Sequence, residues 1–314
     1  MSQTTLQGKL DRRQFIGGAA AVAGGLLLPG VSAAAEEKVV KRTAGDKVAL
    51  GKTGLKPSRL GIGTGSRGGS VQRRLGREGF VKLLRYAYDH GITYIDTAQS
   101  YRIHPWVGEA IKGLPREKLY IQSKIWGLPD KPLEVLDRFR RELGVDYIDT
   151  VLTHCAVRKS WVEDRKRVLD ALAEAKAKKI IRAVGVSCHG LVPLARTPEL
   201  DWLDVVLVRI NPQGVAIDTP EQHGRVYGSN ASHVPLVMKQ IKRLHQRRRG
   251  IIGMKLIGNG DFRKPEDREK SIRFAMQCGL LDAAVIGFKS PAEIDEAIER
   301  INRALAEAPA ARTA

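Results

Sequence analysis

The chain has few cysteines, and no two of them are closely spaced. Of its 314 residues only three are Cys, at positions 155, 188 and 278, and none belongs to a CxxC motif. The absence of such pairs excludes the zinc-ribbon and iron–sulfur patterns. Because the number is odd, at least one thiol stays unpaired even in an oxidising compartment, and no disulfide framework is expected.

The N-terminus lacks an apolar run long enough to cross a bilayer. The apolar residues 15–28 fall short of the roughly 20 that a membrane-spanning helix needs, so no stable membrane anchor is expected. They follow Arg12 and Arg13 and precede the small residues 31–35, which suit a signal peptidase. This order resembles a twin-arginine (Tat) signal, with an ordinary secretory signal as the alternative. The resemblance implies that residues 1–35 are a signal peptide and that the Tat machinery exports residues 36–314, already folded, to the periplasm or another extracytoplasmic space.

Acidic residues are in the minority. The chain has 53 Lys and Arg against 34 Asp and Glu, a formal charge of +19. Such an excess favours contact with polyanions. The basic residues are nevertheless spread over many predicted helices, and the one dense cluster, residues 241–250, is typical of the solvated end of a helix. Nucleic-acid binding is therefore not expected.

The sequence also lacks a G-x-G-x-x-G motif that opens a helix after its first strand, so a Rossmann domain is not expected. Instead, short apolar runs alternate with amphipathic helical stretches. Eight strands are predicted, over residues 59–64, 93–98, 118–126, 146–154, 181–188, 204–211, 250–258 and 282–288. Runs this apolar indicate strands that are buried on both faces of a parallel sheet. Eight strand–helix units in about 250 residues predict a single-domain α/β fold, a closed (β/α)8 TIM barrel.

Polar residues at the ends of three consecutive strands are predicted to form one catalytic site. Asp96, Lys124 and His154 end the second, third and fourth strands, and Tyr101 lies in the loop after Asp96. A buried ammonium needs a partner, and Asp96 is the nearest candidate for Lys124. We expect Lys124 to favour the phenolate, to lower the pKa of Tyr101 and so to make Tyr101 a better proton donor to a carbonyl oxygen. His154 would orient the same oxygen.

Six segments of the chain resemble motifs of a known protein family. The segments LGKTGLKPSRLGIGTG, GITYIDTAQSY, IQSK, LTH, VGVS and VIGFKSPAEIDEAI are similar, in order, to motifs of the aldo-keto reductases, over roughly residues 46–305. The resemblance implies a nicotinamide cofactor, NADP(H) or NAD(H), bound at the strand ends, and an aldehyde, ketone or alcohol as substrate. It also implies that Tyr101 is the general acid, that Lys124 and Asp96 tune it, and that His154 orients the substrate.

The resemblance further implies where the cofactor binds. Ser187 and Cys188 stand where the family has Ser-Asn on the nicotinamide amide, and no clear counterpart of its strand-six glutamine is present. Arg209 or Asn211 is a candidate substitute. Lys255, with glycines such as Gly258 and Gly260 beside it, is a candidate phosphate ligand.

The adenosine end is expected at Phe288, Lys289 and Ser290. Glu293 occupies the place where an arginine would clamp a 2′-phosphate, so it favours NAD(H) if it binds a ribose. Alternatively, Ser290 and Glu293 form a helix-capping box. NADP(H) stays ahead because Lys255 and Lys289 are cationic.

The segment after Tyr101 departs from the family. Arg102 follows where Gly is usual, and the loop is about one residue shorter. His104, Trp106 and Trp126 either wall the substrate pocket or are ordinary loop aromatics.

Two other functions stay open. One is an exported, non-catalytic barrel that binds a nucleotide or another ligand. The other is a metal enzyme with zinc among His154, Cys155, Cys188 and His189, although no metal is expected, because the usual closely spaced ligand pair is missing.

Overall fold

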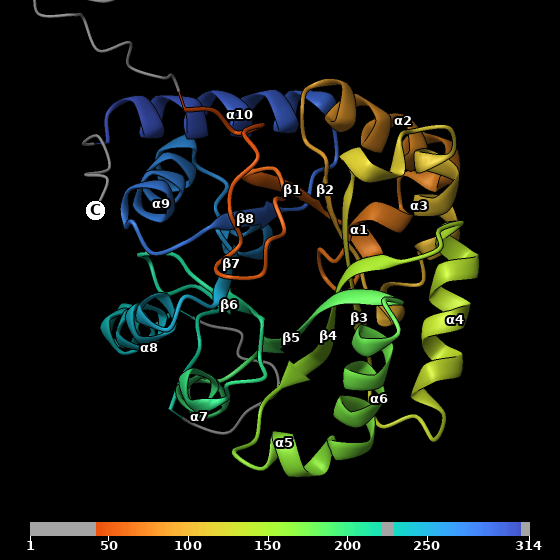
Figure 1. The fold of residues 1–314 in the computed structure, drawn as a ribbon. Helices are drawn as coiled ribbons and strands as arrows, with labels where there is room; N and C mark the ends of the chain where they lie inside the picture. Colours follow the sequence, from red (N-terminus) through yellow and green to blue (C-terminus); the bar gives the residue numbers. More distant parts are fainter. Residues whose placement is uncertain (1–41, 221–228, 309–314) are drawn as a thin grey trace, which may run out of the picture. The chain divides into compact units, whose positions relative to one another are not determined.

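The computed structural model describes residues 42–220 and 229–308; the predicted signal peptide, residues 1–35, lies outside them. Eight parallel strands close into a barrel in sequence order, with β1 hydrogen-bonded to β8 (Figure 1). The strands are β1 (Leu60–Gly63), β2 (Tyr94–Asp96), β3 (Tyr120–Ile125), β4 (Ile148–Ala156), β5 (Ile181–Cys188), β6 (Val205–Arg209), β7 (Gly250–Met254) and β8 (Ala283–Ile286). The predicted (β/α)8 TIM barrel is confirmed.

Helices surround the barrel (Figure 1). The longer ones are α2 (Gly76–Asp89), α3 (His104–Ile111), α4 (Pro132–Leu143), α6 (Lys166–Ala177), α8 (Val234–Gln246), α9 (Pro265–Gln277) and α10 (Pro291–Ala306). The shorter ones are α1 (Ser70–Arg73), α5 (Trp161–Asp164) and α7 (Leu191–Arg196), and the 3₁₀ turns are η1 (Gln99–Tyr101), η2 (Arg116–Lys118), η3 (Thr197–Glu199), η4 (Ala231–His233) and η5 (Gly258–Gly260). Within the described residues, no helix is long and apolar enough to cross a membrane.

Helix α4 illustrates how the sequence sets these elements. Pro132 occupies its first turn, where a missing N–H costs nothing. Leu136, Phe139 and Leu143 recur at helical spacing and are buried against the barrel. Gly144 then ends the helix in the left-handed conformation, with φ of 67°.

Two apolar cores hold the barrel. The outer core packs helices on strands, and the inner core fills the barrel with side chains such as Tyr94, Leu152 and Ile252. Residues 47–58 form a hairpin whose Leu50 and Leu55 extend the inner core. The backbone of this hairpin binds Arg248, just before β7, so it closes the barrel at the N-terminal ends of the strands. The C-terminal ends are left for chemistry.

Strand β4 is irregular where it reaches that open end. Its register with β5 shifts between Thr153 and Ala156, so β4 has one residue more than β5 in this interval. Cys155, within the shift, has φ of 61°, and β4 runs two residues beyond the end predicted at His154. Such a bulge re-aims side chains at the rim of a barrel.

Candidate active site

A buried ion pair lies at the base of the site. Lys124 Nζ donates to both carboxylate oxygens of Asp96, at 2.6 and 2.7 Å, and to the carbonyl oxygen of Thr97 at 2.9 Å. The two charged side chains are 1% and 6% exposed. Gln122 Nε2 donates to the same carboxylate at 2.8 Å. The expected pairing of Lys124 with Asp96 is present, and burial lowers the pKa of Lys124.

Tyr101 lies above this pair. Lys124 Nζ is 5.0 Å from the centre of the phenol ring, and the phenol oxygen is 3.5 Å from His154 Nε2. The expected lowering of the Tyr101 pKa is wrong: burial, and next the carboxylate of Asp96, raise this pKa well above its usual value. Burial favours the neutral phenol, and the hydrogen bonds of Lys124 Nζ to Asp96 and Thr97 leave none for the phenol oxygen to offset this. Tyr101 is therefore protonated at neutral pH, as a proton donor must be.

His154 is held as a neutral imidazole. Its Nδ1 lies 3.3 Å from Ser100 Oγ, and its ring meets the Tyr101 ring edge to face, with centroids 5.5 Å apart. Burial, and then the nearby Lys124 and Arg165, lower its pKa well below the usual value. A neutral ring can donate one hydrogen bond without adding charge, as the orienting role requires.

The aromatic residues expected at the mouth divide into two groups. His104 is buried between Glu142 (Nδ1 to Oε2, 3.1 Å) and Ser123 (Nε2 to Oγ, 2.9 Å), and Trp106 packs on Phe80 in the outer core. Both pack with the core, so neither alternative, a pocket wall or an ordinary loop position, describes them.

Trp126 does lie at the mouth. Its side chain is 47% exposed, and its ring meets His154 edge to face at 5.2 Å. It presents an apolar surface beside the residue expected to orient the substrate.

Arg102 stands directly after Tyr101, where the family usually has Gly, and its backbone conformation shows the effect of this difference. It is exposed and has φ of 56° and ψ of 42°, the left-handed conformation that glycine adopts without strain. The chain thus keeps the backbone turn that a glycine would make, with a less suitable residue. The turn delivers Tyr101 to the site despite the shorter loop.

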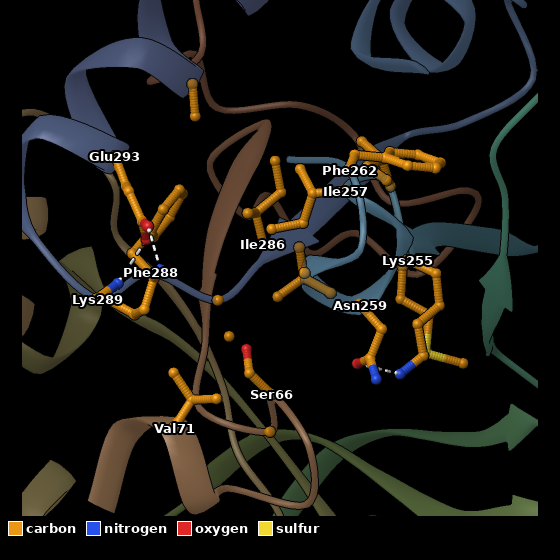
Figure 2. Close-up of a pocket in the computed structure, with 18 of the residues that line it drawn as sticks. Ser66, Val71, Lys255, Ile257, Asn259, Phe262, Ile286, Phe288, Lys289 and Glu293 are labelled. Carbon is orange, nitrogen blue, oxygen red and sulfur yellow. Dashed lines mark hydrogen bonds and ion pairs between the residues drawn. The ribbon is translucent and has the colours of Figure 1, made fainter. Parts of the chain in front are cut away.

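A cleft of about 570 Å³ leads from Asp96 and Tyr101 across the ends of β7, β8 and β1. Four of the nine cofactor candidates line it, namely Lys255, Phe288, Lys289 and Glu293. Figure 2 shows Lys289 and Glu293 on one side of this cleft and Lys255 with Asn259 on the other. The cleft also has lining arginines that sequence reasoning missed, Arg67, Arg74, Arg263, Arg268 and Arg300, which came from separate loops and helices without a shared motif.

Lys255 differs from the other cationic residues of the cleft in its lowered pKa. Burial, and then the charges of Arg209 and Lys124, lower its pKa to about 8. Its Nζ donates to Asn259 Oδ1 at 2.9 Å. Among residues 42–220 and 229–308, Lys255 Nζ forms no ion pair with a carboxylate, so an anion such as a phosphate would meet a cation that is poorly compensated.

The five other cofactor candidates lie outside the cleft lining. Ser187 Oγ is buried and has no hydrogen-bond partner within the described residues, so it could hold a polar group of a ligand. Cys188 is buried in the outer core, and the amide of Asn211 is engaged by the backbone of Val215 (2.8 and 2.9 Å) and by the carbonyl oxygen of Lys255 (3.2 Å). Gly258 begins the turn η5 beside the cleft.

Ser290 caps α10. Its side chain accepts from Glu293 N at 3.3 Å, while Glu293 accepts from Lys289 N at 2.7 Å and pairs with Lys289 Nζ at 3.0 Å. The capping role of Ser290 and Glu293 is thus present, in a variant form in which Glu293 binds Lys289. Glu293 thus neutralises Lys289, which was expected to bind a phosphate of the cofactor.

One ion pair joins the two sides of the cleft. Arg67, after β1, binds Asp261, after β7, with 3.1 Å between Nη2 and Oδ1. No group of three or more His, Cys, Asp or Glu residues that could hold a metal ion is found in residues 42–220 and 229–308. The zinc alternative therefore has no geometric support here.

The family model described as the aldo/keto reductase family matches residues 59–214. The chain belongs to the aldo/keto reductase family of enzymes. This match covers β1 to β6 and so includes Asp96, Tyr101, Lys124 and His154. The family expected from the sequence motifs is confirmed.

The curated relatives match only in part. The "9,11-endoperoxide prostaglandin H2 reductase" of Trypanosoma cruzi is 36% identical over 112 residues, which are 34% of this chain and 38% of that protein. The "NADH-specific methylglyoxal reductase" of Escherichia coli is 29% identical over 167 residues, 45% of this chain and 51% of that protein. The chain thus spans about half or less of the length of these relatives.

Solved structures share the fold. The aldo-keto reductase from Bacillus halodurans (holo form) has a TM-score of 0.65 at 14% identity, over 86% of this chain and 98% of that one. The aldo-keto reductase from Klebsiella pneumoniae, solved in complex with NADPH, has a TM-score of 0.61 at 18% identity, over 84% of this chain and 91% of that one.

Proposed function

We propose that the protein is an NAD(P)H-dependent oxidoreductase that reduces a small aldehyde or ketone, or catalyses the reverse reaction. The observation that carries this proposal is the position of the Tyr101 phenol. It lies 3.5 Å from His154 Nε2 and above the Lys124–Asp96 pair, at one end of a long cleft. A proton donor, a neutral hydrogen-bond donor and a buried cation thus meet at one point.

Each residue has a distinct task in this proposal. The bound nicotinamide would supply the hydride. Tyr101 and neutral His154 donate hydrogen bonds to the carbonyl oxygen, and Tyr101 gives its proton to the alkoxide that forms. Lys124 stabilises the phenolate that remains, and Asp96 holds Lys124 in place. The high pKa of Tyr101 before the reaction keeps that proton available.

The cleft supports a dinucleotide as the cofactor. Its volume of about 570 Å³, the lining Arg74 and Arg263, and the cation of Lys255 suit an extended ligand with phosphates. We propose NADP(H), with NAD(H) as the alternative because Glu293 neutralises Lys289. Relatives give both precedents, an aldo-keto reductase in complex with NADPH and a reductase named as NADH-specific.

The proposal is tested by following oxidation of NADPH and NADH over a panel of small aldehydes with the wild-type protein and with Tyr101→Phe. Phe keeps the ring but has no proton to give. We expect kcat to fall by roughly 10²–10⁴-fold, the usual contribution of a positioned acid. The dissociation constant of NADPH, measured by quenching of tryptophan fluorescence, should change little.

Two results would count against the proposal. Equal rates for the two proteins would remove Tyr101 as the acid. Tight NADPH binding by the wild type without oxidation by any aldehyde would instead favour a non-catalytic binding barrel, which the altered turn at Arg102 makes the second candidate.

We also propose that the Tat route exports the protein in folded form to the periplasm or an equivalent space. The support is the order of Arg12, Arg13, the apolar stretch and the small residues at 31–35. A chain that folds around its cofactor before export needs a route for folded cargo. Replacing Arg12 and Arg13 with Lys should leave the uncleaved protein in the cytoplasm, as fractionation and N-terminal sequencing would show. Export that is unaffected would contradict the proposal.

A further inference from the structure

A second polar group lies at the mouth of the barrel, next to the four residues above. It consists of His189, just after β5, Arg209, at the end of β6, and Asp218, in the following loop. Arg209 is 3% exposed, and its Nε lies 3.5 Å from Asp218 Oδ1. Its Nη2 donates to His189 Nδ1. The proposed proton transfer uses none of these three residues.

The contact between Arg209 and His189 fixes the state of the histidine. A guanidinium can only donate hydrogen bonds, so His189 Nδ1 must accept and cannot carry a proton. The proton of the neutral ring is therefore on Nε2. A second proton on Nδ1 would face a buried cation, and the pKa of His189 is accordingly lowered well below its usual value, by burial and next by Arg209.

The Nε2–H group of His189 is thus a preset donor. In the part of the chain that the structure describes, no side chain or carbonyl accepts a hydrogen bond from it. The Nε2 atom is also not fully buried. The ring is half-buried, whereas Arg209 behind it is buried. The donor is therefore available to a ligand.

The surroundings of His189 favour the substrate over the cofactor. Its ring meets the His154 ring edge to face, with centroids 6.1 Å apart, and His154 also contacts the exposed Trp126. The cofactor cleft instead runs toward β1, β7 and β8, and neither His189 nor His154 lines it. Because the two rings are neighbours, one small substrate molecule can reach the donors of both.

We propose that His189 binds a second, uncharged oxygen of the substrate on the carbon next to the reacting carbonyl, and that Arg209 is the positioning residue that holds its Nε2–H toward this oxygen. This inference rests on the proposed reductase function and narrows its substrate class to carbonyl compounds with a neighbouring hydroxyl or carbonyl group. Asp218 places a carboxyl group beside the buried guanidinium of Arg209, with 3.5 Å between Oδ1 and Nε.

The test compares glycolaldehyde with propionaldehyde, which has a methyl group in place of the hydroxyl. The readout is the ratio of the two kcat/KM values, in which any general loss of activity cancels. In His189→Phe, which removes the donor and keeps a ring, we expect this ratio to fall by roughly tenfold, the usual value of one hydrogen bond. In His189→Gln, which retains an N–H donor, the ratio should be partly restored. An unchanged ratio in His189→Phe would overturn the proposal.

A second measurement uses the unmodified protein and needs no turnover. In ¹⁵N NMR of the histidine rings with NADP⁺ present, His189 should have its proton on Nε2, and glycolaldehyde should shift this signal more than propionaldehyde does. A proton on Nδ1, or equal shifts with both aldehydes, would contradict the inference. If the wild type reduces neither aldehyde, the reductase proposal fails, while the NMR shifts still decide the role of His189.

Discussion

At the scale of single residues, the position of Tyr101 depends on a glycine. A Cβ atom added at Gly65 would lie 2.6 Å from the phenol oxygen of Tyr101 and 2.4 Å from its ring. Real Cβ atoms do not approach other atoms this closely, so any side chain at position 65 must displace the phenol. Gly65 is therefore the residue against which the proposed acid is placed.

The change Gly65→Ala should displace Tyr101 while leaving its chemistry intact. We expect kcat to fall by roughly tenfold to a hundredfold, because misplacement of a reacting group by about 1 Å has costs of this order. Gly79→Ala is the matched control, since Gly79 is exposed on α2 and its added Cβ would meet only Leu75, at 3.6 Å. Steady-state rates that are the same for Gly65→Ala and the control would show that Tyr101 tolerates the methyl group.

The sequence predicts the identities of the site residues better than their electrostatics. Asp96, Lys124 and His154 could be found because each ends, or nearly ends, a strand in a barrel whose strand ends share one mouth. The direction of the Tyr101 pKa could not, because it depends first on how deeply the folded barrel buries the phenol. The buried position of His104 could not be predicted either, since its partners Ser123 and Glu142 are distant in sequence.

At the scale of elements, the loop after β7 makes the cofactor cleft sensitive to pH. Lys255 follows the last residue of β7 and binds Asn259 within the same loop. Its pKa, lowered from 10.5 to about 8, means that the free protein loses this cation as the pH rises through 8. A phosphate needs the protonated form, so binding above pH 8 must include uptake of a proton.

We therefore expect the NADPH dissociation constant to be constant below pH 8 and to rise above it, approaching tenfold per pH unit. In Lys255→Met the dissociation constant should be larger below pH 8 and should not show this rise. Fluorescence titrations across this pH range measure both curves. A rise of the same steepness in Lys255→Met would show that another group is responsible.

Some interactions at the ends of helices and strands could be predicted from the sequence, and others could not. The cap of α10 could be read from Ser290 and Glu293, because capping depends on residues three apart in one helix. The bond between Arg67 and Asp261 could not, because it joins loops separated by 194 residues and follows from the closure of the barrel. The same holds for the bond from Arg209 to His189, which links the ends of two neighbouring strands.

At the scale of the whole barrel, its two ends have different tasks. The hairpin of residues 47–58 closes the N-terminal end with Leu50 and Leu55, and the polar residues gather at the other. The fold was predictable because strands buried on both faces leave continuous apolar runs, and eight of them with intervening helices suit a closed barrel. Cys188 faces the outer core together with Val184 and Val186, because alternate residues of β5 point to the same face of the sheet.

The central claim is that Tyr101 and Lys124 act as one unit, and a double-mutant cycle tests it most directly. The measurement is kcat/KM for NADPH-dependent aldehyde reduction by the wild type, Tyr101→Phe, Lys124→Met and the double variant, with circular dichroism to verify folding. Residues that act as a unit have strongly non-additive effects, so the double variant should be within about threefold of the less active single variant. If the two losses multiply in the double variant, the phenol and the ammonium act independently and the account is contradicted.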